Sequence, residues 1–93
     1  MAWSEMETEY VEYLQAERRS YAWVMRRHGD LAPAEAWAAA LDRYPYEPSD
    51  APYRGLIFHD EAWHWAMLAI HGDRYTVERP ELAVSSAEYV ALE

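Results

Sequence analysis

Cysteine and lysine are both absent from this sequence of 93 residues. Without cysteine there is no disulfide framework and no thiolate ligand for a metal. Nucleophilic thiolates and Schiff-base lysines are likewise excluded from any catalytic scheme. Glycine is scarce, and the three glycines are isolated at positions 29, 55 and 72. A glycine-rich loop that binds phosphate is therefore absent as well.

Long apolar runs are also missing, and none approaches the length that spans a bilayer. Residues 1–7 are acidic and lack the basic and apolar regions of a signal peptide, so we expect a cytoplasmic protein. The serines do not stand in a nucleophile-elbow pattern, and a chain this short has little room for a substrate pocket. Acid–base catalysis by carboxylates and histidines stays open, but the sequence favours a protein that is not an enzyme.

Positive charge is scarce, because eight arginines stand against 17 acidic residues and the net formal charge is −9. This balance disfavours direct binding to nucleic acid or to an anionic membrane, since both rely on basic patches. It is compatible with a basic partner protein, with imitation of nucleic-acid charge, or with solubility alone. Apolar residues make up 52% of the chain, which is enough for a folded core.

Hydrophobic periodicity predicts a mainly α fold, a single helical domain over residues 1–93 built as a small bundle of about four helices. We expect the helices at about 4–27, 33–44, 60–71 and 86–92, with a loop rich in proline and tyrosine at 45–55. The helix at 60–71 is the most apolar and is expected at the centre of the bundle. Residues 56–58 are too few to classify and are at most a strand-like lead into the 60–71 helix, residues 75–77 are strand-like, and Pro80 is expected to begin a helical turn.

Several residues are predicted to define the helix ends. Ser4 with Glu7 and Ser85 with Glu88 have the spacing of capping boxes. Asp60 is the expected N-cap of the 60–71 helix. Glycines 29 and 72 are expected to end the first and third helices, and proline 33 to open the second.

The first helix contains two residues that break its amphipathic pattern. Glu17 is predicted in the middle of the apolar stripe, where an unpaired carboxylate would cost several kcal/mol. It should therefore meet an arginine or histidine from another helix, or help to bind a metal. Trp23 is predicted on the polar side, where it is either covered by a later segment or exposed to a partner.

The 60–71 helix carries the candidate metal ligands. Glu61 and His64 form one Glu-x-x-His pair, the spacing found twice in carboxylate-bridged di-metal proteins. Glu17, Asp60 and His71 are candidates for further ligands. The zinc-protease pattern His-Glu-x-x-His is absent. A simpler interpretation pairs Asp60 with His64 across one turn, leaves His71 to cap carbonyls and needs no cofactor.

The favoured function is protein binding without catalysis, as an adaptor or inhibitor. Tyrosines of the 45–55 loop either pack on the body or meet a partner. The predicted partner-binding residues are Tyr46, Tyr53, Trp23, Glu5, Glu9 and Glu12. A specific version is an inhibitor from a phage or another mobile element that occupies a basic nucleic-acid-binding site of its partner.

Two alternatives remain open. The first is a metal-binding, small redox or hydrolytic protein that uses Glu61 and His64. The second is a homodimer in which two copies of the 60–71 helix meet and double the Glu-x-x-His motif.

Overall fold

The computed structural model describes the backbone of residues 3–92 and the side chains of residues 5–92, so the side chain of Ser4 and its predicted capping box lie outside the described part. The elements are α1 (Trp3–Gly29), α2 (Pro33–Arg43), the 3-10 turn η1 (Leu56–His59), α3 (Ala62–His71), α4 (Tyr75–Glu78), the 3-10 turn η2 (Pro80–Ala83) and α5 (Ala87–Val90). No strand occurs over residues 3–92, and the predicted mainly α fold is confirmed. No described helix is both long and apolar enough to cross a membrane.

The two segments predicted as strand-like are helical turns, so that prediction is wrong. In η1 the amide of Phe58 donates to the carbonyl of Gly55 at 3.0 Å, and in α4 the amide of Glu78 donates to the carbonyl of Arg74 at 2.9 Å. A strand would need a second strand beside it to satisfy these groups, whereas a helical turn satisfies them locally. The helical turn predicted at Pro80 is confirmed as η2.

Two predicted N-caps are displaced by one residue. The extended residue before α3 is Glu61, so the prediction of Asp60 as N-cap is wrong. At α5 the hydroxyl of Ser86 accepts the amide of Tyr89 at 3.2 Å, which makes Ser86 the cap instead of Ser85. Adjacent candidates of the same chemistry cannot be separated by spacing alone, because helix ends shift by one or two residues.

Of the two glycines that were predicted to end helices, one does so and the other does not. Gly72 ends α3 with φ 91°, and its amide donates to the carbonyl of Leu68 at 2.9 Å, as predicted. Gly29 is still part of α1, and Asp30 takes the left-handed conformation with φ 58°. Glycine at position 29 allows a close approach to α3, since a Cβ there would lie 3.3 Å from the side chain of Ile70 and would have to displace it by a few tenths of an ångström. This close approach brings the end of α1 against α3.

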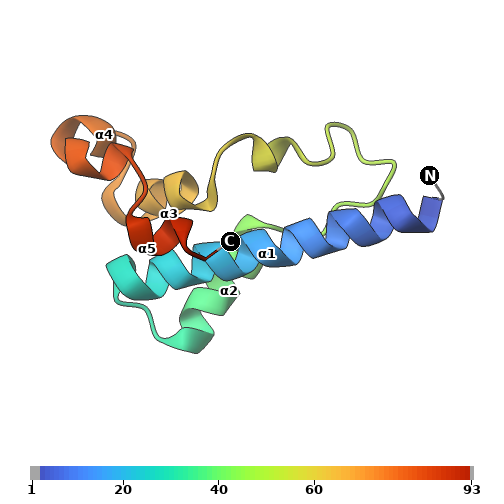
Figure 1. The fold of residues 1–93 in the computed structure, drawn as a ribbon, viewed down its shortest axis with the longest axis horizontal. Helices are drawn as coiled ribbons and strands as arrows, with labels where there is room; N and C mark the ends of the chain where they lie inside the picture. The colour runs from blue at the N-terminus through green and yellow to red at the C-terminus, as the bar shows by residue number, and fades with distance from the viewer. Residues whose placement is uncertain (1–2, 93) are drawn as a thin grey trace.

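The longest helix, α1, is the element against which both α2 and α3 pack (Figure 1). Its 27 residues span about 40 Å and account for the elongated shape, which measures 45 × 27 × 23 Å. The 60–71 helix was expected in this central position. The buried core residues come from every helix: Leu14, Tyr21, Ala22, Val24, Met25, Ala36, Ala40, Tyr44, Ala62, Trp63, Ala66, Met67, Tyr75 and Tyr89.

A buried arginine joins α1 to the end of α2. Arg18 is only 9% exposed, and its Nε and Nη2 atoms donate to the carbonyl oxygen of Tyr44 at 2.9 and 2.7 Å. Tyr44 is the C-terminal cap of α2. A cation is favourable there because the last carbonyls of a helix carry partial negative charge. The buried Tyr44 ring stacks on Phe58 and meets the ring of Tyr21 edge-on, so α1, α2 and η1 meet at this residue.

The charged residue on the buried face of α1 is Arg18, whereas Glu17 was predicted there. Glu17 is half-buried at the side of the helix, and the neighbouring Arg18 is the charged residue inside. Spacing explains this placement, because Arg18 follows Leu14 by four residues and precedes Tyr21 by three, which puts all three on one helix face.

We predict that Arg18→Met lowers the free energy of unfolding by about 2–3 kcal/mol, because it leaves the buried Tyr44 carbonyl without its charged donor. Urea unfolding followed by circular dichroism measures the change. The exposed Arg79→Met is the matched control and should change stability by less than about 0.5 kcal/mol. Equal stability of the two variants would show that the Arg18 bonds do not hold α2 in place.

Candidate functional site

A groove of about 890 Å³ runs along α1. Its floor is the face of α1 that carries Ala16, Ser20 and Trp23. One wall comes from α2 with Trp37, and the other from residues 58–61 together with the end of the chain at Leu92. In Figure 1, α2 lies on one side of α1, and η1 and α5 lie on the other.

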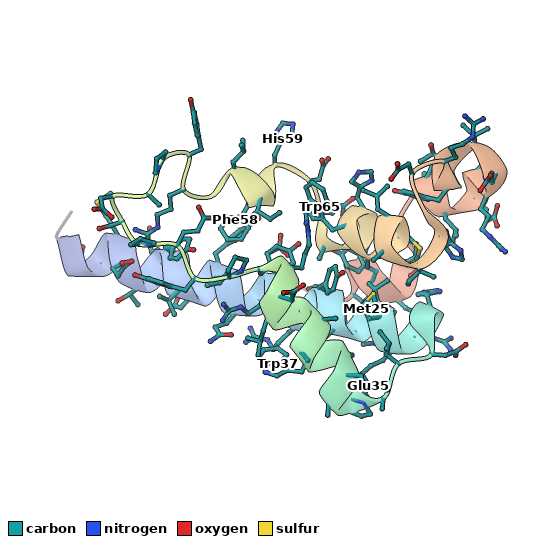
Figure 2. The ribbon with its side chains drawn as sticks, turned by 180° about the vertical axis from the view of Figure 1, so that it is seen from behind. Met25, Glu35, Trp37, Phe58, His59 and Trp65 are labelled. Carbon is teal, nitrogen blue, oxygen red and sulfur yellow. The ribbon has the colours of Figure 1, made fainter. Side chains whose placement is uncertain are left out.

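The groove is lined by aromatic rings from four different elements. Trp23 and Tyr13 come from α1, Trp37 from α2, Phe58 from η1 and Tyr89 from α5. Seen from behind, Phe58 points toward α1, whereas His59 points away from the helices (Figure 2). The Phe58 ring lies 4.6 Å from the ring of Tyr13, measured between centroids. Large rings of this kind supply contact area at a small cost in side-chain entropy.

Charge divides the groove lengthwise. Arg19 and Arg26 are exposed seven residues apart along one edge of α1. The opposite edge carries Glu17, Asp60 and Glu61. At 100° per residue, Glu17 and Arg19 point to opposite sides of the floor residues. The groove is therefore apolar at its centre and oppositely charged at its two edges.

The predicted acidic residues continue the floor of this groove toward the N-terminus. Glu5, Glu9 and Glu12 are all exposed. Their spacing, extended through Ala16 and Ser20 to Trp23, consists of steps of three or four residues and so follows one stripe of the helix. Four of the six predicted partner-binding residues thus share one face of α1, which runs about 27 Å from Glu5 to Trp23.

The two predicted loop tyrosines are in different environments. The hydroxyl of Tyr46 donates to both carboxylate oxygens of Glu7 at 3.2 Å, and its ring meets the ring of Tyr10 edge-on. Arg54 also pairs with Glu7, and its guanidinium lies 3.6 Å from the centroid of Tyr10. These contacts fix the loop to the first half of α1. Tyr53, with φ 59°, is 82% exposed at the far side of the loop.

The candidate metal ligands are not gathered into a cluster. Over residues 5–92, no group of three or more histidine, aspartate and glutamate side chains is placed to hold an ion. Nδ1 of His64 lies 2.7 Å from the hydroxyl of Tyr75 on α4, whereas Asp60 was the expected partner. Burial raises the pKa of the Tyr75 hydroxyl, and the charges of Asp60 and Glu61 add to the effect.

The indoles of α3 hold the surrounding turns in place. Nε1 of Trp63 donates to the carbonyl of Leu82 at 2.8 Å, and Nε1 of Trp65 donates to the carbonyl of Ile57 at 3.0 Å. The guanidinium of Arg43 lies 4.2 Å from the centroid of the Trp65 ring. A buried indole needs a hydrogen-bond acceptor, and here the two indoles find theirs in η2 and η1. These bonds give α3 a structural role.

The sequence analysis did not identify the role of His28 at the end of α1. Its ring lies between the indoles of Trp23 and Trp63, at centroid distances of 6.1 and 5.2 Å. Its buried Nε2 has no hydrogen-bond partner among the described residues. Burial lowers the pKa of His28, and the neighbouring Arg27 lowers it further. Trp63 lies 35 residues away in sequence, so no local pattern could indicate this arrangement.

No family model, curated protein or solved structure matches the chain. The function is therefore inferred from the geometry of its residues.

We predict that the protein loses stability as the pH falls from about 7.5 to about 5.5, in part through His28. The pKa of His28 is lowered in the folded state, so the unfolded chain binds more protons as the pH drops below about 6.5. Urea unfolding at several pH values should show a weaker pH dependence in His28→Gln than in the wild type. The exposed His59→Gln is the control, and identical pH profiles for the wild type and His28→Gln would contradict the prediction.

Proposed function

We propose that this protein is a non-enzymatic binding module that docks on a partner protein through one face of α1. The observation that carries the proposal is the alignment of Glu5, Glu9 and Glu12 with Trp23 on a single helix stripe. Acidic side chains and an aromatic groove thus form one continuous surface on a rigid helix. Such a surface suits a partner segment that is basic at one end and apolar at the other.

The two parts of this surface contribute differently to binding. Exposed carboxylates attract a basic partner from solution and fix its orientation, but each contributes less than about 1 kcal/mol of affinity. The groove supplies most of the affinity, because aromatic anchors in water-excluding pockets dominate protein interfaces. Trp23 on the floor and Trp37 on the wall are the anchors of this kind. Arg19 and Arg26 lie along one edge of the groove and repel a partner segment that carries positive charge along its whole length.

A module of this kind acts as an inhibitor when the basic surface that it covers is a nucleic-acid-binding site. The net charge of −9 supports this form of the proposal, because it gives the module the sign of charge that a basic nucleic-acid-binding site attracts. Heparin, a polyanion, should then compete with the module for the partner.

We predict that the triple variant E5Q/E9Q/E12Q binds the partner about tenfold more weakly than the wild type, and that the loss shrinks at high salt. The partner is captured on the immobilised wild-type protein from an extract of the source organism and identified by mass spectrometry. It is then purified, and its affinity is measured by calorimetry at low, physiological and high salt. Trp23→Ala should weaken binding by about 30-fold or more, with little dependence on salt.

The matched control is D73N/E78Q/E81Q, which makes the same change in net charge at exposed positions on the opposite end of the molecule. Circular dichroism checks that each variant keeps its helices. Equal affinity of E5Q/E9Q/E12Q and the control would show that the stripe on α1 is not the binding surface.

A further inference from the structure

The edge of α1 carries a charge pattern with a period of seven residues. Four exposed charged residues follow one another at intervals of seven residues: Glu5, Glu12, Arg19 and Arg26. Residues with this spacing stay on one side of a helix that packs against another helix, because seven residues make two turns. The edge is therefore negative over its first half and positive over its second half.

Such an order is self-complementary only when two copies run in opposite directions. In an antiparallel pair, Glu5 faces Arg26 of the second copy and Glu12 faces Arg19, and the symmetry repeats both pairs. A parallel pair places glutamate beside glutamate and arginine beside arginine. Shifting an antiparallel pair by one heptad brings Glu12 against Glu12. The pattern thus selects one orientation and one register.

The residues beside this edge fit the same register. Six residues lie on the face that two antiparallel helices would share: Met6, Glu9, Tyr13, Ala16, Ser20 and Trp23. In this register Met6 lies opposite Trp23, Tyr13 opposite the small Ala16, and Glu9 opposite Ser20. Large side chains thus meet small or flexible ones, as close helix packing requires.

Four of these six residues are exposed on the folded molecule, and Ser20 and Trp23 are half-buried. Met6 and Tyr13 are each 51% exposed. A hollow of about 360 Å³ beside them is lined by Met6, Glu9, Tyr13 and Phe58, and the larger groove continues from Tyr13 past Trp23. Both hollows lie along this face of α1, whereas α2 and α3 pack against its other faces.

We infer that the occupant of this face, when no partner is bound, is a second copy of the chain, held antiparallel through α1. The dimer is isologous, since each copy offers the same surface to the other. It uses α1 and leaves α3 outside the interface, in contrast to the dimer considered from the sequence. The inference goes beyond the proposed function and adds a consequence, namely that self-association and partner binding exclude one another.

Charge reversal tests the pairing. Sedimentation equilibrium at about 0.1 mM protein and 0.15 M salt should show a wild-type dimer. E5R/E12R makes the whole edge positive and R19E/R26E makes it negative, so each variant alone should be monomeric. An equimolar mixture of the two should form a heterodimer. The fourfold variant E5R/E12R/R19E/R26E restores complementarity at the wild-type net charge and should form a homodimer.

The set of variants separates specific pairing from the effect of total charge. E5R/E12R carries a net charge of lower magnitude than the wild type, so general repulsion alone would make it the stronger dimer. That result would overturn the inference, as would a monomeric wild type or two reversed variants that fail to pair when mixed. If the fourfold variant does not fold, the mixture still decides the question. A wild-type monomer that still captures a partner rejects the dimer and leaves the proposed function standing.

Discussion

The arrangement of the helices depends on the contact between the Arg18 guanidinium and the carbonyl of Tyr44. A buried arginine is costly unless its donors are satisfied, and two of them reach a helix terminus that favours positive charge. Because Tyr44 also packs against Phe58, this contact fixes the end of α2 and the position of η1 together. The walls of the groove are α2 and the segment after η1, so this contact shapes the groove together with the hydrogen bond from Trp65 that holds η1.

The aromatic residues serve two purposes that the structure separates. The indoles of Trp63 and Trp65 donate hydrogen bonds to carbonyls of η2 and η1, and Nδ1 of His64 lies within hydrogen-bond distance of the Tyr75 hydroxyl. These groups connect short turns that have little core of their own. Trp37 is partly exposed and Trp23 is half-buried, and both lie along the groove. The histidine- and tryptophan-rich helix is thus structural, and the open face belongs to α1.

Helix content was predictable because the apolar residues repeat with helical spacing over long segments, most clearly in α1 and α2. The shared face of Glu5, Glu9, Glu12 and Trp23 also follows from spacing alone. Three-dimensional contacts could not be obtained in this way. Nothing near Tyr44 in sequence indicates that Arg18, 26 residues earlier, caps its carbonyl. Segments 56–58 and 75–77 have residues typical of strands, yet they form turns because they dock on helices. For Tyr46 the sequence left open packing on the body or contact with a partner, and its hydroxyl donates to Glu7 of α1.

The most direct test of the account is a measurement of which indoles sense the partner. Proton–nitrogen NMR resolves the indole N–H groups of the tryptophans, and substitution assigns each one. On addition of the purified partner, the signal of Trp23 and the backbone amides of residues 5–23 should shift, while the indole signals of Trp63 and Trp65 stay in place. Shifts confined to Trp63, Trp65 and the amides of α3 would contradict the account.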